Sequence, residues 1–217
     1  MVNTGLIRFV DRAIGSPLCL LLSMLSRKRE IELKKSKRIL FIQLWGIGET
    51  ILTLPAVGSI KRKFKDSQVY VLATDRNKEV YLSSLDVNVL TTKLSIFSLL
   101  RLIAYNFRKF DIVIDMEEYL NISSLLSFFL GKQRIGYSHG ARSRIYNLRV
   151  DYNDKQHALK TFLDLAKPLG AKEERIVKLK YSEKDKKSYH RQWPCVQGAD
   201  AEDGSGYFKA EEDSRTS

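Results

Sequence analysis

The sequence predicts an α/β protein with a Rossmann-like parallel sheet and helices on both faces. Short runs of large aliphatic residues alternate, over residues 38–167, with longer segments of helical period. The runs are almost continuously apolar, which is typical of strands that are buried on both faces. Because strands and helices alternate along the chain, the pattern indicates parallel pairing with crossover helices.

The expected elements follow in chain order. We expect strands at 38–44, 68–73, 87–90, 111–116 and 134–137. We expect helices at 51–64, from 74–78 onward, and at 95–107, 123–130 and 157–167. Pro55 is expected in the first turn of its helix or just beyond it, and Pro168 with Gly170 should end the last helix.

A two-glycine turn after the first expected strand is the strongest candidate site. Glu49 follows Gly46 and Gly48 where the strand leads into a helix, so its carboxylate is expected at the carboxyl edge of the sheet. The alternative is a tight turn followed by an ordinary first-turn acid that the helix dipole stabilises and keeps ionised. Nucleotide binding by this turn is unsupported, because Ile51 replaces the third glycine of a dinucleotide fingerprint and no P-loop lysine follows.

Five motifs, in this order, resemble glycosyltransferase family 9, the lipopolysaccharide heptosyltransferase family. The motifs are RILFI at 38–42, GIGETILTLPA at 46–56, FDIVIDM at 110–116, GKQRIGY at 131–137 and HALKTFLD at 157–164. The resemblance covers about residues 38–180. It implies the N-terminal half of a GT-B glycosyltransferase, in which two Rossmann-like domains face each other across a cleft.

The resemblance also implies the chemistry. The N-terminal domain of such enzymes holds a saccharide acceptor, and the C-terminal domain holds a nucleotide-sugar, typically ADP-heptose, as co-substrate. Heptosyltransferases usually carry Asp, the proposed general base, at the position of Glu49. Glu adds one methylene, so the acceptor hydroxyl must lie about 1.5 Å further out or the side chain must fold back. The implied reaction is a single inverting displacement, and neither a cofactor nor a metal is expected.

Further candidates for acceptor binding lie where expected strands end. Trp45 could stack on a sugar ring or fill the edge of the sheet. Glu117 follows a strand as an acid that could bind hydroxyls or be merely solvated. The loop after 134–137 could bind phosphate through arginine or be an exposed polar loop. The full set of acceptor-binding candidates is Trp45, Gly46, Gly48, Thr50, Glu117, His139 and Arg142. His157 is expected to be structural.

Composition restricts the compartment and the partners. The chain has 217 residues, of which 44% are hydrophobic, enough for a packed core. Cys19 and Cys195 match no metal or redox spacing, which favours a reducing compartment. The net charge of the chain is +12. Residues 190–217 hold three basic and six acidic residues and contribute −3, so residues 1–189 carry +15. Such a field attracts anions, whether nucleic acid, a phosphorylated glycolipid or an anionic membrane.

The first thirty residues favour attachment to a membrane. Apolar residues recur at helical spacing from Leu6 to Ile14, and the apolar run 17–25 is too short to span a bilayer. Basic residues between 27 and 38 could bind anionic headgroups. A cleavable signal peptide and a helix packed on the core are the alternatives. We expect a cytoplasmic protein, peripheral on the inner face of the cytoplasmic membrane.

The end of the chain differs from the rest. We expect an amphipathic segment at 1–30, a Rossmann-like acceptor domain at 37–188 and a disordered tail at 189–217, where large aliphatic residues are scarce. A donor-binding domain would follow in the family. We therefore expect a truncated or frame-shifted chain that is inactive alone, with a separate polypeptide as one source of the donor site.

Two other functions remain open from the sequence. The chain could be a basic, non-catalytic α/β module that binds an anionic membrane or a partner protein, with Glu49 as a capping acid only. Nucleic-acid binding is the weaker alternative, because the basic residues are dispersed and no aromatic-rich recognition motif accompanies them.

Overall fold

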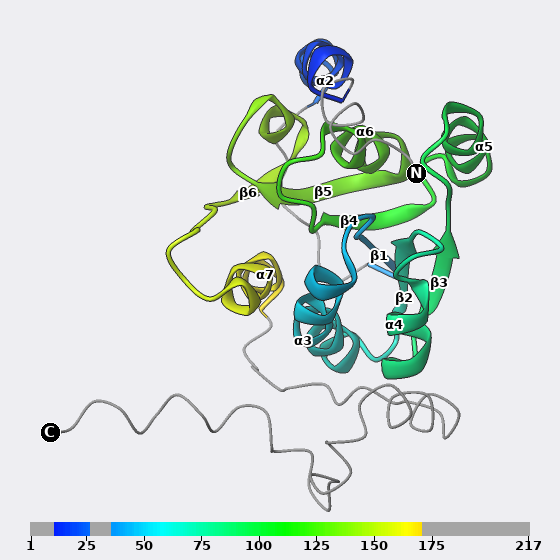
Figure 1. The fold of residues 1–217 in the computed structure, drawn as a ribbon, viewed down its shortest axis with the longest axis vertical. Coiled ribbons are helices and arrows are strands. Elements are labelled where there is room, and N and C mark those ends of the chain that lie inside the picture. Colours follow the sequence, from blue (N-terminus) through cyan, green and yellow to red (C-terminus); the bar gives the residue numbers. More distant parts are fainter. Residues whose placement is uncertain (1–10, 27–35, 171–217) are drawn as a thin grey trace, which may run out of the picture. The chain divides into compact units, whose positions relative to one another are not determined.

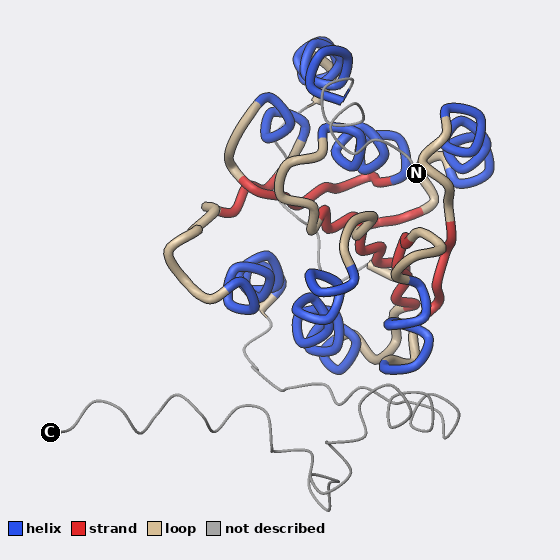
Figure 2. The backbone as a smooth tube through the Cα atoms, viewed as in Figure 1, coloured by secondary structure: helices blue, strands red, loops and turns tan. Residues whose placement is uncertain are grey.

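Six parallel strands form the central sheet of the computed structural model, which describes residues 11–26 and 36–170. The strands lie in the order β3-β2-β1-β4-β5-β6, and each neighbouring pair is parallel (Figure 2). They are β1 (Arg38–Ile42), β2 (Gln68–Ala73), β3 (Asn88–Thr91), β4 (Phe110–Asp115), β5 (Gly131–Tyr137) and β6 (Leu148–Val150). The predicted Rossmann-like α/β class is confirmed.

Helices cover both faces of this sheet (Figure 1). One face packs against α3 (Ile47–Lys63), α4 (Lys78–Ser84) and α7 (Ala158–Ala166), which is followed by the short helix η3 (Lys167–Leu169). The other face packs against α5 (Ile96–Asn106) and α6 (Asn121–Leu130). Outside α6 lie η1 (Asp11–Gly15), α2 (Ser16–Ser23) and η2 (Ala141–Ile145).

The central strand shows why the apolar runs are continuous. Ile39 and Phe41 of β1 belong to the core between the sheet and α3, whereas Leu40 and Ile42 belong to the core under α5 and α6. Successive side chains of a strand point to opposite faces, so both sets of positions must be apolar when both faces are covered. All four side chains are fully buried. The sheet is therefore fixed by two separate cores.

The expected strands and helices are all present, and most of their ends differ from the expected positions by a few residues. The main differences are the start of α3, which begins at Ile47 instead of 51, and the strand β6, which the sequence did not predict. Pro55 consequently lies inside α3 and not near its first turn. The predicted tail at 189–217 and residues 171–188 of the predicted domain lie outside the described residues.

The N-terminal helix packs on the body of the protein through one side. Cys19 of α2 is fully buried and contacts a small core with Leu125 and Ile145, and its thiol lies 3.2 Å from the Ser124 hydroxyl. This packing agrees with the alternative of a helix on the protein's own core. The first ten residues of the predicted membrane segment and residues 27–30 are outside the described chain. No helix within residues 11–26 and 36–170 is both long and apolar enough to cross a membrane.

Replacing Gly136 by Ala should destabilise the fold, because β5 has no room for a methyl group there. A Cβ at Gly136 would lie 2.4 Å from the ring of Tyr146, which is buried and donates a hydrogen bond of 2.6 Å to Asp115. We expect urea denaturation to show a loss of about 2 kcal/mol or more in the free energy of unfolding.

The matched control is Gly48→Ala, because a Cβ at Gly48 meets nothing within 4 Å and the residue is helical. This change should be neutral or stabilising by up to about 1 kcal/mol. An equal loss of stability in both variants would contradict the packing around Gly136.

Candidate functional site

A cavity lies at the carboxyl ends of β1 and β4, the two central strands. The chain proceeds from β1 outward to β3 and then returns to place β4 on the other side of β1, which makes this edge a topological switch point. The cavity has a volume of about 370 Å³. Its lining comes from the segments after β1 and β4 and from η1 and α7: Asp11, Arg12, Gln43, Trp45, Glu49, Met116, Glu117, Glu118, Tyr119, Leu120, Asn121 and Phe162.

Glu49 reaches this cavity from the first turn of α3, where its side chain is exposed. The side chain folds back over the turn, so that Oε2 lies 2.8 Å from the place a Cβ would occupy on Gly46. Gly46 has φ of +67°, in the region that favours glycine. The turn thus needs glycine for its backbone angle and for the clearance of the Glu49 carboxylate.

Glu117 ties the end of β1 to the end of β4. Its Oε1 accepts hydrogen bonds from the backbone amides of Leu44 and Trp45, the latter at 2.9 Å. Glu117 is only 5% exposed yet lines the cavity. Burial raises the pKa of Glu117 to about 8, although the amide of Leu44 opposes the rise. A cavity acid that holds its proton near neutral pH is a typical feature of functional sites.

Gln43 is a cavity residue that the sequence analysis did not single out. Its Nε2 donates to the carbonyl of Trp45 at 2.8 Å, which fixes the orientation of the amide. Its Oε1 is buried and has no hydrogen-bond partner among the described residues. An unpaired buried acceptor costs free energy, so this oxygen is suited to accept a hydrogen bond from a ligand hydroxyl or a water. The signal in the sequence was its place as the first polar residue after β1.

Five of the seven predicted acceptor-binding residues do not line the cavity: Gly46, Gly48, Thr50, His139 and Arg142. Gly46 lines a neighbouring cavity instead. Thr50 is fully buried, where its hydroxyl donates to the Gly46 carbonyl at 2.6 Å and accepts from Asn77 at 2.9 Å. Gly48 is exposed but contributes nothing to the lining. Arg142, expected on a polar loop, lies in η2 and is only 2% exposed.

Arg142 belongs to a buried network of charged and polar groups. Its Nη2 donates to Asp115 Oδ2 at 2.8 Å and to the Tyr146 hydroxyl at 2.8 Å. Asp115 also accepts from the Ser123 hydroxyl at 2.9 Å. Removing one partner of such a pair would leave a buried charge, which is strongly destabilising. Arg142 therefore anchors η2 and the end of β4 to each other.

His139 supports the cavity wall from behind instead of lining it. Its Nε2 donates to the carbonyl of Glu118, while Tyr152 donates to the Glu118 carboxylate at 2.9 Å. The imidazole lies among the rings of Tyr119, Tyr137 and Tyr152. Burial lowers the pKa of His139, so the neutral form is favoured. His157 caps α7 by accepting from the Leu159 amide, in agreement with its predicted structural role.

Residues of η1 close one side of the cavity, although no sequence pattern pointed to this segment as part of the site. The Asp11 carboxylate accepts from the amides of Asn121 and Ile122, both at 2.8 Å, and so caps the first turn of α6. Arg12 follows directly and lines the cavity. The segment before the sheet is therefore part of the candidate site.

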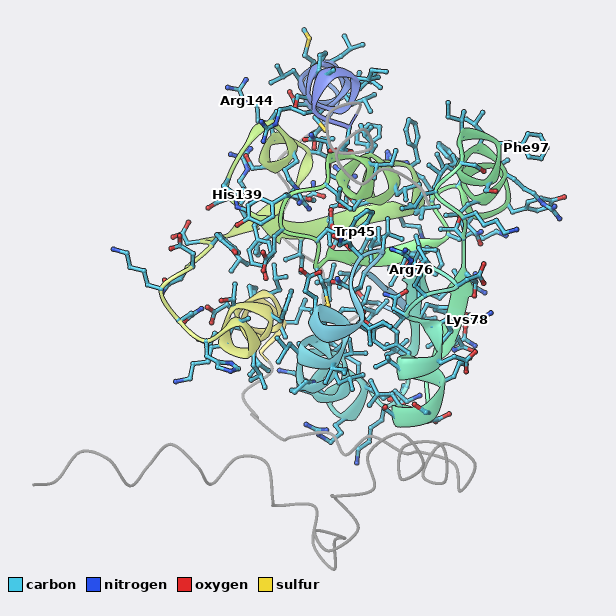
Figure 3. The ribbon with its side chains drawn as sticks, in the orientation of Figure 1. Trp45, Arg76, Lys78, Phe97, His139 and Arg144 are labelled. Atoms are coloured by element: carbon cyan, nitrogen blue, oxygen red, sulfur yellow. The ribbon has the colours of Figure 1, made fainter. Side chains whose placement is uncertain are left out.

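Trp45 separates this cavity from a second one of about 460 Å³. The second cavity lies at the carboxyl ends of β1, β2 and β3 and includes the exposed cations Arg76 and Lys93. In the view of Figure 3, the label of Trp45 lies between those of Arg76 and His139. An indole exposed to two cavities has an apolar ring available for stacking.

The free energy of unfolding should depend on pH through Glu117. Because its pKa is raised in the folded state, the folded protein holds more protons than the unfolded one between about pH 4.5 and 8, and stability falls as pH rises through this range. Glu117→Gln keeps an acceptor for the two amides but does not titrate. As pH rises from 5 to 8.5, the free energy of unfolding of the variant should increase by a few kcal/mol relative to that of the parent, since one pKa unit corresponds to about 1.4 kcal/mol. Stability curves that stay parallel over this range would contradict the raised pKa.

Comparisons with known proteins bear on the fold. No protein-family model matches the chain, and no curated protein matches it by sequence. Among solved structures, the glycosyl transferase family 9 protein from Veillonella parvula DSM 2008 is similar with a TM-score of 0.60 and 16% identity over 72% of this chain. E. coli heptosyltransferase WaaC, solved with ADP-2-deoxy-2-fluoro heptose, is similar with a TM-score of 0.54 and 20% identity over 62% of this chain.

A third similar structure is E. coli ADP-heptose lps heptosyltransferase II, with a TM-score of 0.52 and 17% identity over 72% of this chain. The matches cover 49%, 49% and 50% of those chains, so this chain spans about half of their length. The neighbours belong to the family that the five sequence motifs resemble. At these identities the comparison shows a shared fold: the described chain has the Rossmann-like α/β architecture found in half of a family 9 glycosyltransferase.

Proposed function

We propose that this chain is the acceptor-side domain of a glycosyltransferase similar to the heptosyltransferases. The enzyme would transfer a sugar from a nucleotide-sugar of the ADP-heptose type to a lipopolysaccharide-core or related glycan acceptor. The ordered motifs and the shared fold with family 9 glycosyltransferases support this function. In this proposal a donor-binding domain, on the same or a separate polypeptide, faces the carboxyl edge of the sheet.

The observation that carries the proposal is the position of Glu49. Its carboxylate lies on the rim of a cavity beside Trp45, at the switch point of the sheet. The extra methylene relative to Asp is accommodated because the side chain folds back over Gly46. An acceptor hydroxyl in the cavity can therefore approach the carboxylate without the shift that an extended side chain would require.

The reaction assigns different tasks to the cavity residues. Glu49 accepts the proton of the acceptor hydroxyl while its oxygen attacks the anomeric carbon and the nucleoside diphosphate leaves from the opposite side. The Trp45 ring stacks on the saccharide. Gln43 Oε1 accepts a hydrogen bond from a second hydroxyl, and protonated Glu117 donates one from Oε2. Two acids with different protonation states at one site are a recurrent arrangement in catalysis.

Glu49→Gln should abolish most turnover without weakening acceptor binding. Loss of a positioned base is expected to cost about 10² to 10⁴-fold in kcat, because the amide cannot accept the proton. Turnover is measured with ADP-heptose and a lipid-linked core acceptor, using the chain joined to a donor-binding domain. Acceptor binding to the chain alone is measured by calorimetry.

Glu79→Gln is the matched control. Glu79 is also an exposed acid in the first turn of a helix, α4, but it does not line the cavity. Full activity in both variants would show that Glu49 is not the base, and would favour the alternative that it is only a capping acid in a non-catalytic binding module. An equal loss of turnover in both variants would indicate that removing an acid from a helix N-terminus lowers activity in general, and not that Glu49 acts as a base.

A further inference from the structure

Helix α5 carries apolar side chains on both its inner and its outer side. Leu99, Leu102 and Ile103 pack on the core beneath the sheet, and no residue of the helix is fully buried. On the outer side Ile96 is 80%, Phe97 78% and Leu100 60% exposed. Figure 3 shows Phe97 on the outside of α5, directed away from the sheet. Large apolar side chains grouped on the exposed side of a helix are often covered by protein or by lipid.

Helix α2 shows the same property on the same side of the sheet. Its inner side carries the buried Cys19, whereas Leu21 is 62% exposed and, just after the helix, Met24 is 83% and Leu25 72% exposed. Both α5 and α6 cover one face of the sheet, and α2 packs outside α6 (Figure 1). The two groups of exposed apolar residues therefore lie over the same face of the sheet, and each contains several large side chains.

The charges of α5 and its flanking segments are mostly basic, although Asp75 lines a cavity together with Arg101 and Tyr105. Residues 87–110 include Lys93, Arg101, Arg108 and Lys109 and contain no acidic residue. Exposed aromatic side chains, Phe97, Tyr105 and Phe107, lie among these cations. Large apolar and aromatic side chains beside basic residues are the composition of an interfacial helix that lies in the headgroup region of a bilayer. Cations near such a surface are attracted by anionic lipids.

We propose that the outer sides of α5 and α2 form one surface that binds an anionic lipid bilayer. Ile96, Phe97 and Leu100 insert at the boundary between headgroups and acyl chains, while Arg101 and Arg108 contact lipid phosphates. The sequence analysis expected membrane attachment from residues 1–38, so α5 is an additional contact. The surface does not depend on the role of Glu49. Since η1 continues into α2 and Arg12 lines the cavity, this attachment keeps the cavity near the bilayer.

The test is binding of the full chain to vesicles. Vesicles of phosphatidylglycerol and phosphatidylethanolamine, and vesicles of phosphatidylcholine alone, are sedimented with the parent chain and with the double variant Phe97→Ser/Leu100→Ser. We expect the parent chain to bind the anionic vesicles and the double variant to bind them at least tenfold more weakly. Leu82→Ser is the control, because Leu82 is 54% exposed on α4, which packs on the opposite face of the sheet.

Two further variants test the contribution of charge and the insertion of the apolar side chains separately. Arg101→Gln/Arg108→Gln should weaken binding to anionic vesicles by about fivefold per cation and leave the weak binding to phosphatidylcholine unchanged. Phe97→Trp should keep the binding and add an indole emission that shifts to shorter wavelength when vesicles are added, compared with the parent chain.

Three results would overturn the proposal. The first is that the parent chain does not bind anionic vesicles. The second is that Leu82→Ser weakens vesicle binding as much as Phe97→Ser/Leu100→Ser does. The third is that the indole of Phe97→Trp shows the emission of an indole in water while the chain is bound. Self-association that Phe97→Ser/Leu100→Ser abolishes, without vesicle binding by the parent chain, would identify a second copy of the chain as the occupant instead.

Discussion

The parallel pairing of β1 with β4 is the constraint on which the candidate site depends. Ile42 pairs with Asp115 at the ends of the two strands, and the Met116 amide donates to the Ile42 carbonyl at 3.0 Å. The segments that follow β1 and β4 therefore leave the sheet at the same edge, the first toward Glu49 and the second toward Glu117. Glu117 then accepts hydrogen bonds from the amides of Leu44 and Trp45, just after β1, so the two walls of the cavity are held to each other.

Buried polar groups stabilise this edge from behind the cavity. Asp115 ends β4 in contact with Arg142, Tyr146 and Ser123, while Asn77 holds the segment after β1 by donating to the Gln43 carbonyl. These hydrogen bonds form only when η2, α4 and the strand ends are all in place. The geometry of the cavity is thus a consequence of the whole fold and not of the glycine turn alone.

The sequence was sufficient for strands β1 to β5 and for the place of Glu49 at the edge of the sheet, because continuous apolar runs and a glycine turn indicate local conformation and burial. It was not sufficient for β6, which is only three residues long. It was not sufficient for Arg142 or Thr50, since an arginine or a hydroxyl near a strand end can face either the cavity or the interior. Asp11 and Arg12 were missed as site residues because η1 is held at the site by contacts of Asp11 with α6, which join segments about 110 residues apart. Only long-range packing places those side chains at the site.

The most direct measurement is a crystal structure of the chain with an acceptor saccharide bound. The account predicts that the saccharide lies between Trp45 and Glu117, with a hydroxyl within about 3.2 Å of the Glu49 carboxylate. A saccharide bound away from this cavity, or one whose hydroxyls all lie beyond hydrogen-bonding distance of Glu49, would contradict the assignment.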